Sequence, residues 1–451
     1  MQTRLFSHRS LTALMIPSVL SFAVASGCNG DDDSNTGAGG SSAKGGKGGS
    51  AGKAASAGRG GTSGAATGGR GGSAGTSARA GRGGTGATGG TSNDNGGAGQ
   101  AGTGTAGAGA GGENAGGAGA GGEGGQVATE LPVVQTNLTT DATGASVVDP
   151  SLVNAWGLAI NPASSGASFW VSAAGTGLAT VYDASGAVQS TIVTIPPASG
   201  TGLGSPTGQV YNPSTDFSGD VFIFATEDGL IEGWQSGSLA VMRADRSAAG
   251  ASYKGLALVT SGASHTLAAA NFHEGTVDVF DAAYARVTTS GLFVDPEQPT
   301  GYAPFNVAQL GNSVYVAYAK QDADKADEVA GAGNGYVNEF GVDGSFTRRL
   351  VSRGDLDAPW GLALAPASYG ALANTLLVGN FGDGEIHGYR LADGSEAGTL
   401  VNAAGDPVVI DGLWALAFGP NTTAADLRST LFFTAGPSDE THGLFGKITL
   451  P

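Results

Sequence analysis

Residues 271–280, NFHEGTVDVF, align without a gap with residues 380–389, NFGDGEIHGY. Looser copies of this pattern occupy residues 176–182 and 226–234. In both aligned stretches an acidic residue and a glycine separate two runs that are rich in β-forming residues. This order is typical of a β-hairpin, because glycine takes the positive φ that a tight hairpin turn requires. The pattern therefore predicts hairpins that recur along the chain.

A short apolar strand precedes these hairpins and recurs six times. The six strands are residues 156–160, 207–210, 254–258, 305–308, 360–364 and 414–418. Their second residues are separated by 51, 47, 51, 55 and 54 positions. Short strands in units of about fifty residues are typical of β-propellers, in which each blade is a four-stranded antiparallel sheet. The spacing predicts an all-β, six-bladed propeller, whereas two β-sandwiches would not explain six equal repeats.

The last repeat supplies only three strands, in residues 413–418, 431–434 and 444–450. Residues 131–139 lie before the first repeat, and we predict that they add the fourth strand to the last blade. Closure of this kind removes the exposed sheet edges that an open ring would leave. We therefore expect the two ends of the folded region to share one sheet.

Composition divides the 451 residues into three domains. Residues 29–126 hold 40 of the 82 glycines and contain no Val, Ile, Leu, Met, Phe, Tyr, Trp or Cys. A segment of this composition cannot bury enough apolar surface to offset the entropy of ordering, so it is predicted to be a disordered linker. Residues 1–28 form a predicted signal peptide before it, and the propeller is predicted for residues 127–451.

The N-terminus has the features of an export signal. Arg4 and Arg9 precede an apolar run at residues 11–24, which is too short to span a bilayer but has the length of a signal peptide's hydrophobic segment. The run leads into residues 25–28, ASGC, which resemble the bacterial lipobox, although this motif more often begins with Leu. Cys28 is the only cysteine, and we predict that it carries a lipid. The prediction is an outer-membrane lipoprotein of the cell envelope, with plain secretion as the alternative.

The charge of the folded region restricts its partners. Residues 127–451 contain 12 basic and 32 acidic side chains, which gives a net charge of −20. Such a surface repels phosphate backbones, so nucleic acid is excluded as a partner, and a membrane would be contacted through the N-terminal lipid alone. Cations, positively charged proteins and neutral ligands such as glycans remain open. We expect a monomer.

Several motifs of the repeats also match a known group of proteins. These motifs are residues 302–307, 320–325, 359–366, 379–384 and 411–416. Through them the chain resembles an uncharacterised family of exported bacterial proteins, many of which end in a PEP-CTERM sorting tail and whose blades are similar to NHL repeats. The resemblance covers about residues 131–450. The sequence has no sorting tail, so we expect the lipobox-like segment to serve as the anchor. The resemblance implies an NHL-like propeller and an exported protein, and it supplies no activity.

One face of the predicted propeller gathers residues with oxygen ligands. The loops that enter the innermost strands and the turns between second and third strands lie on the same face, around the central channel. Calcium takes six to eight oxygen ligands, so a Ca²⁺ site is one interpretation of this face. The alternative is that these residue types serve the turns themselves. The predicted metal ligands are Asn154, Asn271, Asn306, Asn380, Asp228, Glu274, Asp383 and Glu440.

Aromatic and histidine side chains are the other candidates on this face. Trp156, Trp360 and Trp414 begin innermost strands, as does Phe305, and these rings are predicted either to stack on a ligand or to pack between blades. His273 and His442 are predicted ligand-binding residues, either as a base beside a carboxylate or as solvated turn residues.

The loop at residues 321–335 is the longest irregular insertion between two strands. We interpret it either as a functional insertion on a rigid scaffold or as a mobile, solvated loop.

The sequence contains no motif for covalent catalysis. It has no Gly-x-Ser-x-Gly elbow, no phosphate-binding loop and no cysteine nucleophile in the folded region. The favoured hypothesis is therefore a binding or scaffold module for a protein, peptide or glycan. The alternatives are a metal-dependent hydrolase similar to six-bladed lactonases and esterases, with a cation at the channel, and a purely structural spacer.

Overall fold

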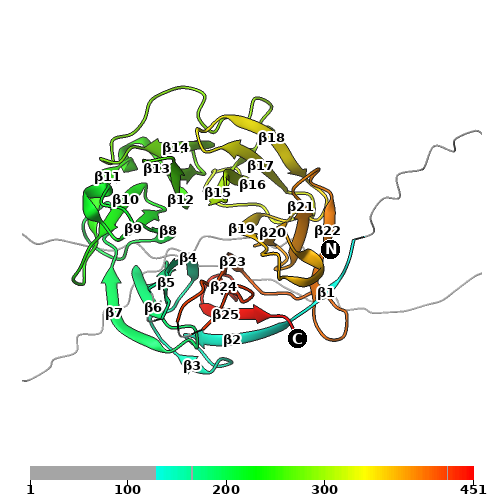
Figure 1. The fold of residues 1–451 in the computed structure, drawn as a ribbon. Helices are drawn as coiled ribbons and strands as arrows, with labels where there is room; N and C mark the ends of the chain where they lie inside the picture. Colours follow the sequence, from blue (N-terminus) through cyan, green and yellow to red (C-terminus); the bar gives the residue numbers. More distant parts are fainter. Residues whose placement is uncertain (1–127, 164–165, 424) are drawn as a thin grey trace, which may run out of the picture. The chain divides into compact units, whose positions relative to one another are not determined.

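The computed structural model describes residues 128–163, 166–423 and 425–451. The predicted signal peptide, Cys28 and the glycine-rich linker lie outside the described residues. All described residues belong to one compact unit. Within it, six sheets are arranged around a central axis, as Figure 1 shows, and this confirms the predicted six-bladed propeller.

The first three blades follow one another in chain order, each with its innermost strand first. Blade one contains β4 (Ala155–Asn161), β5 (Ser168–Ala173), β6 (Leu178–Tyr182) and β7 (Val188–Thr194). Blade two contains β8 (Pro206–Tyr211), β9 (Phe222–Thr226), β10 (Leu230–Trp234) and β11 (Val241–Asp245). Blade three contains β12 (Tyr253–Ser261), β13 (Ser264–Asn271) and β14 (Thr276–Phe280).

The remaining three blades include the ring closure. Blade four contains β15 (Tyr302–Leu310), β16 (Ser313–Lys320), β17 (Gly335–Gly341) and β18 (Phe346–Ser352). Blade five contains β19 (Pro359–Leu364), β20 (Thr375–Asn380), β21 (Ile386–Arg390), β22 (Glu396–Val401) and β1 (Leu131–Pro132). Blade six contains β23 (Leu413–Phe418), β24 (Leu431–Ala435), β25 (Leu444–Thr449), β2 (Val134–Thr140) and β3 (Val147–Val148). Three short 3₁₀ helices lie in the connections: η1 (Phe217–Gly219), η2 (Ser247–Ala249) and η3 (Gly370–Leu372).

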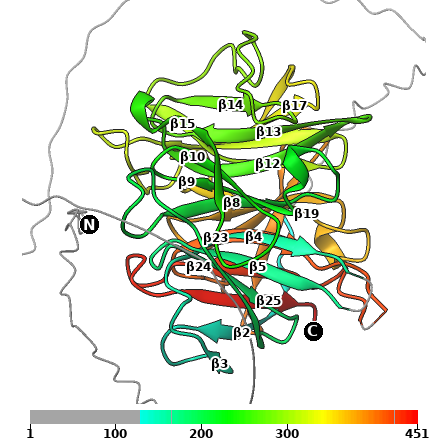
Figure 2. The same cartoon turned by 90° about the vertical axis from the view of Figure 1, so that its left-hand side faces the viewer.

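The closing strand lies where the sequence predicts it, with one difference. β2 pairs antiparallel with β25, and the register runs from Val134 opposite Thr449 to Thr140 opposite Leu444. Figure 2 shows these two strands side by side. Leu131, however, belongs to β1, which pairs in parallel with β22 of blade five. The N-terminal segment therefore joins two blades, because its buried apolar side chains pack into the core between blades five and six.

Blade three departs from the predicted four strands. Residues 281–301 follow β14 without a further strand and make one isolated bridge, between Phe280 and Arg286. This segment contains Pro296 and Pro299, and proline lacks the N–H that a ladder would use. The prediction of four strands is thus wrong for this blade.

Apolar side chains pack mainly between blades. Six of the seven buried clusters join neighbouring blades, for example Phe222 of blade two with Trp170 of blade one, whose rings stack at 3.9 Å. The seventh cluster lies at the axis. Burial between sheets holds the ring rigid and fixes the loops at its centre. The described residues contain no helix with the length and apolar character needed to cross a membrane.

Candidate functional site

The channel face is the face formed by the loops that enter the innermost strands and the turns between second and third strands. Backbone hydrogen bonds join these two kinds of segment within a blade. Phe272 N–H donates to Ser252 O at 2.8 Å in blade three, and Gly436 N–H donates to Gly412 O at 2.8 Å in blade six. The predicted grouping of these loops on one face is therefore confirmed.

The centre of the channel is filled by an aromatic cluster, comprising Trp156, Phe272, Phe305, Trp360, Phe381 and Trp414. Trp414 lies in the middle, with ring-centroid distances of 3.8 Å to Trp156 and 4.1 Å to Phe381. It is fully buried, and the predicted ligand-stacking rings Trp156, Phe305 and Trp360 are at most 5% exposed. These rings therefore pack against one another, which is close to the second of the two interpretations from the sequence, packing between blades. Stacking of the rings on a ligand stays a prediction.

A small cavity of about 100 Å³ lies along the innermost strands of all six blades. Asn306 and Gln209 supply polar groups to its wall. Asn306 Nδ2 donates to Trp360 O at 2.7 Å, while the buried Oε1 of Gln209 has no hydrogen-bond partner. A volume of this size fits a few water molecules and no larger ligand. A larger surface cavity, about 530 Å³, lies in blade five and is lined partly by Arg390 and Ala397, with no carboxylate in its wall.

Lys254 takes the place of an aromatic residue at the channel. It begins the repeated apolar strand of blade three, in the position that Trp156, Trp360 and Trp414 hold in theirs. Its side chain is only 2% exposed, and Nζ lies 5.3 Å from the Trp156 ring centroid. A buried ammonium over an indole face gains cation–π attraction, but it also needs carboxylates to offset the cost of desolvation.

Those carboxylates come from two other blades. Lys254 Nζ lies 2.5 Å from Glu227 Oε1, after β9, and 3.3 Å from Asp327 Oδ1, in the loop between β16 and β17. Burial alone would lower the pKa of the Lys254 ammonium, but the charges of Glu227, Asp327 and Glu328 outweigh burial and raise that pKa above its ordinary value. Lys254 is therefore a permanent cation at the centre of the channel face.

Two further carboxyl groups hold their protons more tightly. Burial raises the pKa of Glu328 to about 8; Lys254 opposes the shift, and the charge of Glu440 adds to it. Burial likewise raises the pKa of Glu440 to about 7, with the charge of Glu227 adding and Lys254 opposing. Both carboxyls therefore exchange protons near neutral pH, which lets them act as general acids or bases or accept an incoming cation.

We name Lys254, Glu227, Asp327, Glu328 and Glu440 the channel cluster. With all four carboxyls ionised it carries four negative charges and one positive charge, a net charge of −3. With Glu328 and Glu440 protonated the net charge is −1. The cluster therefore stays negative throughout the range in which these two groups titrate.

The loop at residues 321–335 is part of this cluster. Its first half is ordered by an antiparallel bridge between Gln321 and Glu328 and by a hydrogen bond of 2.5 Å from Gln321 Nε2 to Phe272 O. These contacts position Asp327 and Glu328 at the channel. The structure thus shows contacts that hold the first half of this loop, and a functional role for the insertion stays a prediction.

Asn154 connects the cluster to the aromatic rings. Its Nδ2 donates to Glu440 Oε2 at 2.6 Å, and its Oδ1 accepts from Trp414 Nε1 at 3.0 Å. Asn154 has a φ of 49°, a left-handed conformation that Asn tolerates better than most residues. Gly436 leaves the space for this contact, because a Cβ there would lie 2.4 Å from Asn154 Oδ1.

Four of the other predicted metal ligands form local pairs within their blades. Asn271 Nδ2 donates to Glu274 Oε2 at 2.6 Å, and Asn380 Nδ2 donates to Asp383 Oδ2 at 3.3 Å. Asp228 accepts from Ala198 N–H at 2.5 Å. Among the described residues, the groups of three His, Cys, Asp or Glu ligand atoms lying close together include only Asp383 from the predicted set. The eight residues do not form one coordination shell.

The two predicted histidines also have local surroundings. His442 is exposed, and its Nδ1 lies 2.8 Å from Asp141 Oδ2, so its carboxylate partner is not the nearby Glu440. His273 is partly buried beside Glu274, whose carboxylate forms an ion pair with Arg246 at 2.9 Å. Neither histidine joins the channel cluster.

Sequence reasoning identified Glu440 and the loop that carries Asp327 and Glu328, and it missed Lys254 and Glu227 as parts of one site. The available signal was Lys254, a lysine in a repeated position that is aromatic in four blades. Glu227, Asp327 and Glu328 could not be assigned to it, because the contact depends on the curvature of the ring.

No family model matches this chain. Two curated proteins of Acanthamoeba polyphaga mimivirus are similar to it over most of their length. "Uncharacterized protein R648" is 32% identical over 322 residues, which cover 67% of this chain and 76% of that protein. "Uncharacterized protein L690" is 32% identical over 321 residues, which cover 66% of this chain and 81% of that protein.

Solved propeller structures are similar at a lower level. A glucose dehydrogenase is 14% identical with a TM-score of 0.45, covering 70% of this chain and 98% of its own. A streptogramin B lyase is 10% identical with a TM-score of 0.40, covering 71% and 97%. A protein of unknown function from Bacteroides thetaiotaomicron is 10% identical with a TM-score of 0.44, covering 70% and 72%.

Proposed function

This chain belongs to the same family as the two uncharacterised mimivirus proteins, and we propose that its propeller is a binding module for a positively charged group of a protein or peptide. The channel cluster is the binding surface. One observation carries the proposal: four carboxyl groups surround a single buried ammonium, that of Lys254, and leave a negative surplus. The net charge of −20 over residues 127–451 extends the attraction beyond the cluster.

The chemistry of Lys254 indicates what kind of group the cluster accepts. Its ammonium lies between carboxylates and an indole ring. A lysine side chain or terminal amine of a ligand would meet the partly exposed carboxyls of Glu328 and Glu440 in the same way. Because those carboxyls have pKa values of about 8 and about 7, an arriving cation displaces their protons. Affinity for the cation therefore rises as the pH rises through this range.

We propose further that the module is exported and anchored in the cell envelope through a lipid on Cys28. The lipobox-like residues 25–28 and the position of the only cysteine support this. Membership of the exported bacterial NHL-like family is part of the same proposal, supported by the motifs of the inner strands.

Hydrolysis of a lactone or ester is the second candidate function. The two carboxyls with pKa values near neutrality favour it, because such groups can donate and accept protons during a reaction. A metal at the channel is less well supported, since the ammonium of Lys254 already lies among the carboxylates. We therefore rank binding first.

Binding of a labelled oligolysine peptide to the full-length chain, followed by fluorescence anisotropy, tests the proposal. We expect binding that weakens with salt, and an affinity that falls about tenfold in Glu440→Gln and in Glu328→Gln, as loss of one partly buried charge predicts. Asp343→Asn is the matched control, because it removes one charge from an exposed turn between β17 and β18.

Two outcomes would contradict binding at the cluster. Equal losses in Asp343→Asn and Glu440→Gln would assign the affinity to the acidic surface in general. An unchanged affinity in both cluster variants would exclude the cluster as the binding surface. Turnover of an aryl ester that disappears in Glu328→Gln would favour the hydrolase instead.

A further inference from the structure

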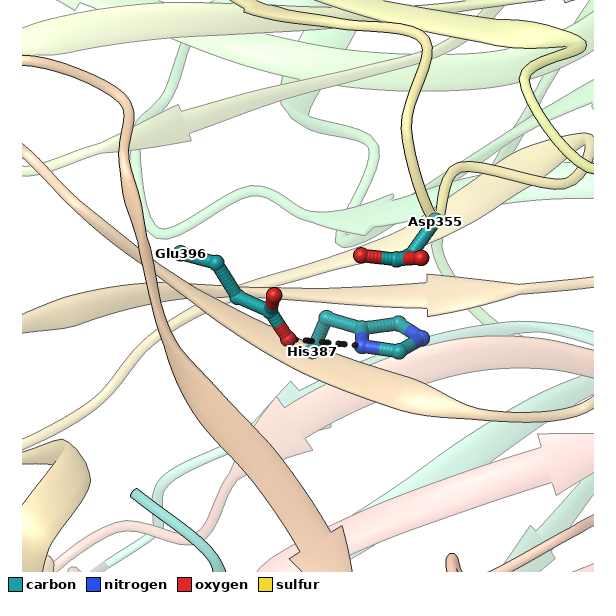
Figure 3. A group of neighbouring side chains, drawn as sticks. All are labelled: Asp355, His387 and Glu396. Atoms are coloured by element: carbon teal, nitrogen blue, oxygen red, sulfur yellow. Dashed lines mark hydrogen bonds and ion pairs between the residues drawn. The ribbon is translucent and has the colours of Figure 1, made fainter. Parts of the chain in front are cut away.

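Blade five surrounds a buried imidazole with carboxylates. We name Asp355, Asp383, Glu385, His387 and Glu396 the blade-five cluster. His387 on β21 is 5% exposed, while its neighbours lie in the loop before β19, in the turn between β20 and β21, and on β22. Figure 3 shows the carboxylates of Asp355 and Glu396 directed toward the His387 ring from two different segments. The ligand atoms form two groups of three, each within 4.8 Å and each containing His387.

The two ring nitrogens of His387 have different surroundings. Nδ1 lies 3.1 Å from Thr399 Oγ1 and 3.4 Å from Glu396 Oε1, so it has hydrogen-bond partners. Nε2 is buried and has no hydrogen-bond partner, and Glu385 Oε2 lies 3.5 Å from it. A buried polar atom without a partner is costly, and in native proteins it calls for an explanation. When Nδ1 carries the hydrogen, Nε2 presents a lone pair toward the carboxylates of its own turn.

The separation of these atoms fits a bound ion. Two ligand atoms at about 2.1 Å from a tetrahedral metal lie about 3.4 Å apart, which is close to the observed 3.5 Å between Nε2 and Glu385 Oε2. Metal-bound histidines usually donate their other N–H to a hydroxyl, carbonyl or carboxylate, as Nδ1 can do here with Thr399 and Glu396.

We propose that Nε2 of His387 binds a divalent transition-metal ion together with the carboxylates of Asp383 and Glu385. Imidazole with carboxylates suits zinc, cobalt or manganese and is not a ligand set for calcium. Asp383 is exposed and Glu385 partly exposed, so an ion reaches the site from solvent. The site lies within one blade and uses none of the residues of the channel cluster.

Binding of Co²⁺ alone to the purified full-length chain is the test, because tetrahedral Co²⁺ reports its ligands by visible absorption. We expect one equivalent by isothermal titration calorimetry and an absorption band that excess Zn²⁺ abolishes. His387→Gln should lower the affinity at least about 100-fold and Glu385→Gln at least about tenfold, on the scale of ligand and supporting residues. His265→Gln is the matched control, because His265 has a single carboxylate partner, Asp216, at 2.7 Å.

Three results would overturn the site. The first is a wild-type protein that binds no stoichiometric Co²⁺. In that case the carboxylates around His387 would be explained as partners of a protonated imidazole. The second is His387→Gln that binds as tightly as wild type. The third is a larger loss in Glu396→Gln than in Glu385→Gln, which would move the ion away from Nε2. Glu385 is partly exposed, so its variant keeps the test valid where His387→Gln fails to fold.

Discussion

The channel cluster and the blade-five cluster each place one basic side chain among carboxylates, but the two basic groups differ in their hydrogen-bond and ion-pair partners. The ammonium of Lys254 contacts carboxylates of two blades and lies over an indole ring. The imidazole of His387 has hydrogen-bond partners at Nδ1 and no hydrogen-bond partner at Nε2, which lies 3.5 Å from Glu385 Oε2. An ammonium has only hydrogen-bond donors, so carboxylates can pair with all of them. An imidazole nitrogen without a hydrogen can instead coordinate a metal ion. The comparison teaches that the carboxylates around Lys254 neutralise its ammonium, whereas His387 keeps one nitrogen without a hydrogen bond, which is available for the metal ion that we propose.

Among the variants that test this comparison, removal of the Lys254 ammonium should have the largest effect on the free energy of unfolding. Lys254→Met keeps the length of the side chain but leaves Glu227, Asp327 and Glu328 without their cation. We expect the free energy of unfolding to fall by about 3 kcal/mol at neutral pH, the lower end for breaking a buried ion pair, because all three carboxylates are partly exposed. Urea unfolding measures the change.

A double variant serves as the control for Lys254→Met. Glu227→Gln in the same chain removes one of the carboxylates that lost its cation, so part of the stability should return. A double variant that is less stable than Lys254→Met alone would show that the pair contributes by packing and not by charge.

The titration of the two channel carboxyls, Glu328 and Glu440, should change the free energy of unfolding by less than the removal of Lys254 does. Glu328 and Glu440 have folded-state pKa values of about 8 and about 7, above the ordinary 4.5, so the folded state binds more protons than the unfolded state between these values. The free energy of unfolding should therefore fall as the pH rises from about 5 to 8. Both side chains are partly exposed, and solvent screening reduces the effect of the pKa shifts, so we expect a fall on the order of 1–2 kcal/mol. Glu328→Gln should flatten this dependence in urea unfolding at several pH values.

Glu232 in blade two provides the reference for that experiment. Burial, with the charge of Asp228 adding to it, raises its pKa to about 8 as well, so the Glu328 variant should keep a residual slope. Glu232→Gln should lower the slope without changing the affinity for an oligolysine peptide. A Glu328 variant with the wild-type slope would show that Glu328 does not titrate in this range.

Repeats made the fold predictable. The Gly-containing turns, the six inner strands and the missing strand of the last blade are local patterns, and the ring closure by β2 follows from them. The missing strand of blade three was not predictable from spacing, because its repeat has the ordinary length and differs in Pro296 and Pro299.

The sites were only partly predictable. Glu440 and Asp383 were predicted because they lie in turns on the channel face. The basic residues Lys254 and His387 were not predicted as site residues. Lys254 contacts carboxylates from the loops of other blades, and Asp355 and Glu396 approach His387 from separate segments. The orientation of a ring nitrogen has no signature in the sequence.

Removal of the His387 ring should have the smallest effect on stability when no metal is present. His387→Gln gives up the contact of Nδ1 with Thr399 but also removes a buried nitrogen that lacks a hydrogen-bond partner. These two terms oppose each other, so the free energy of unfolding should change by less than about 1 kcal/mol in thermal or urea unfolding with a chelator present. A loss as large as that of Lys254→Met would mean that the imidazole supports the fold as a charged partner of its carboxylates. The contrast between the two clusters would then disappear, because both basic groups would be structural.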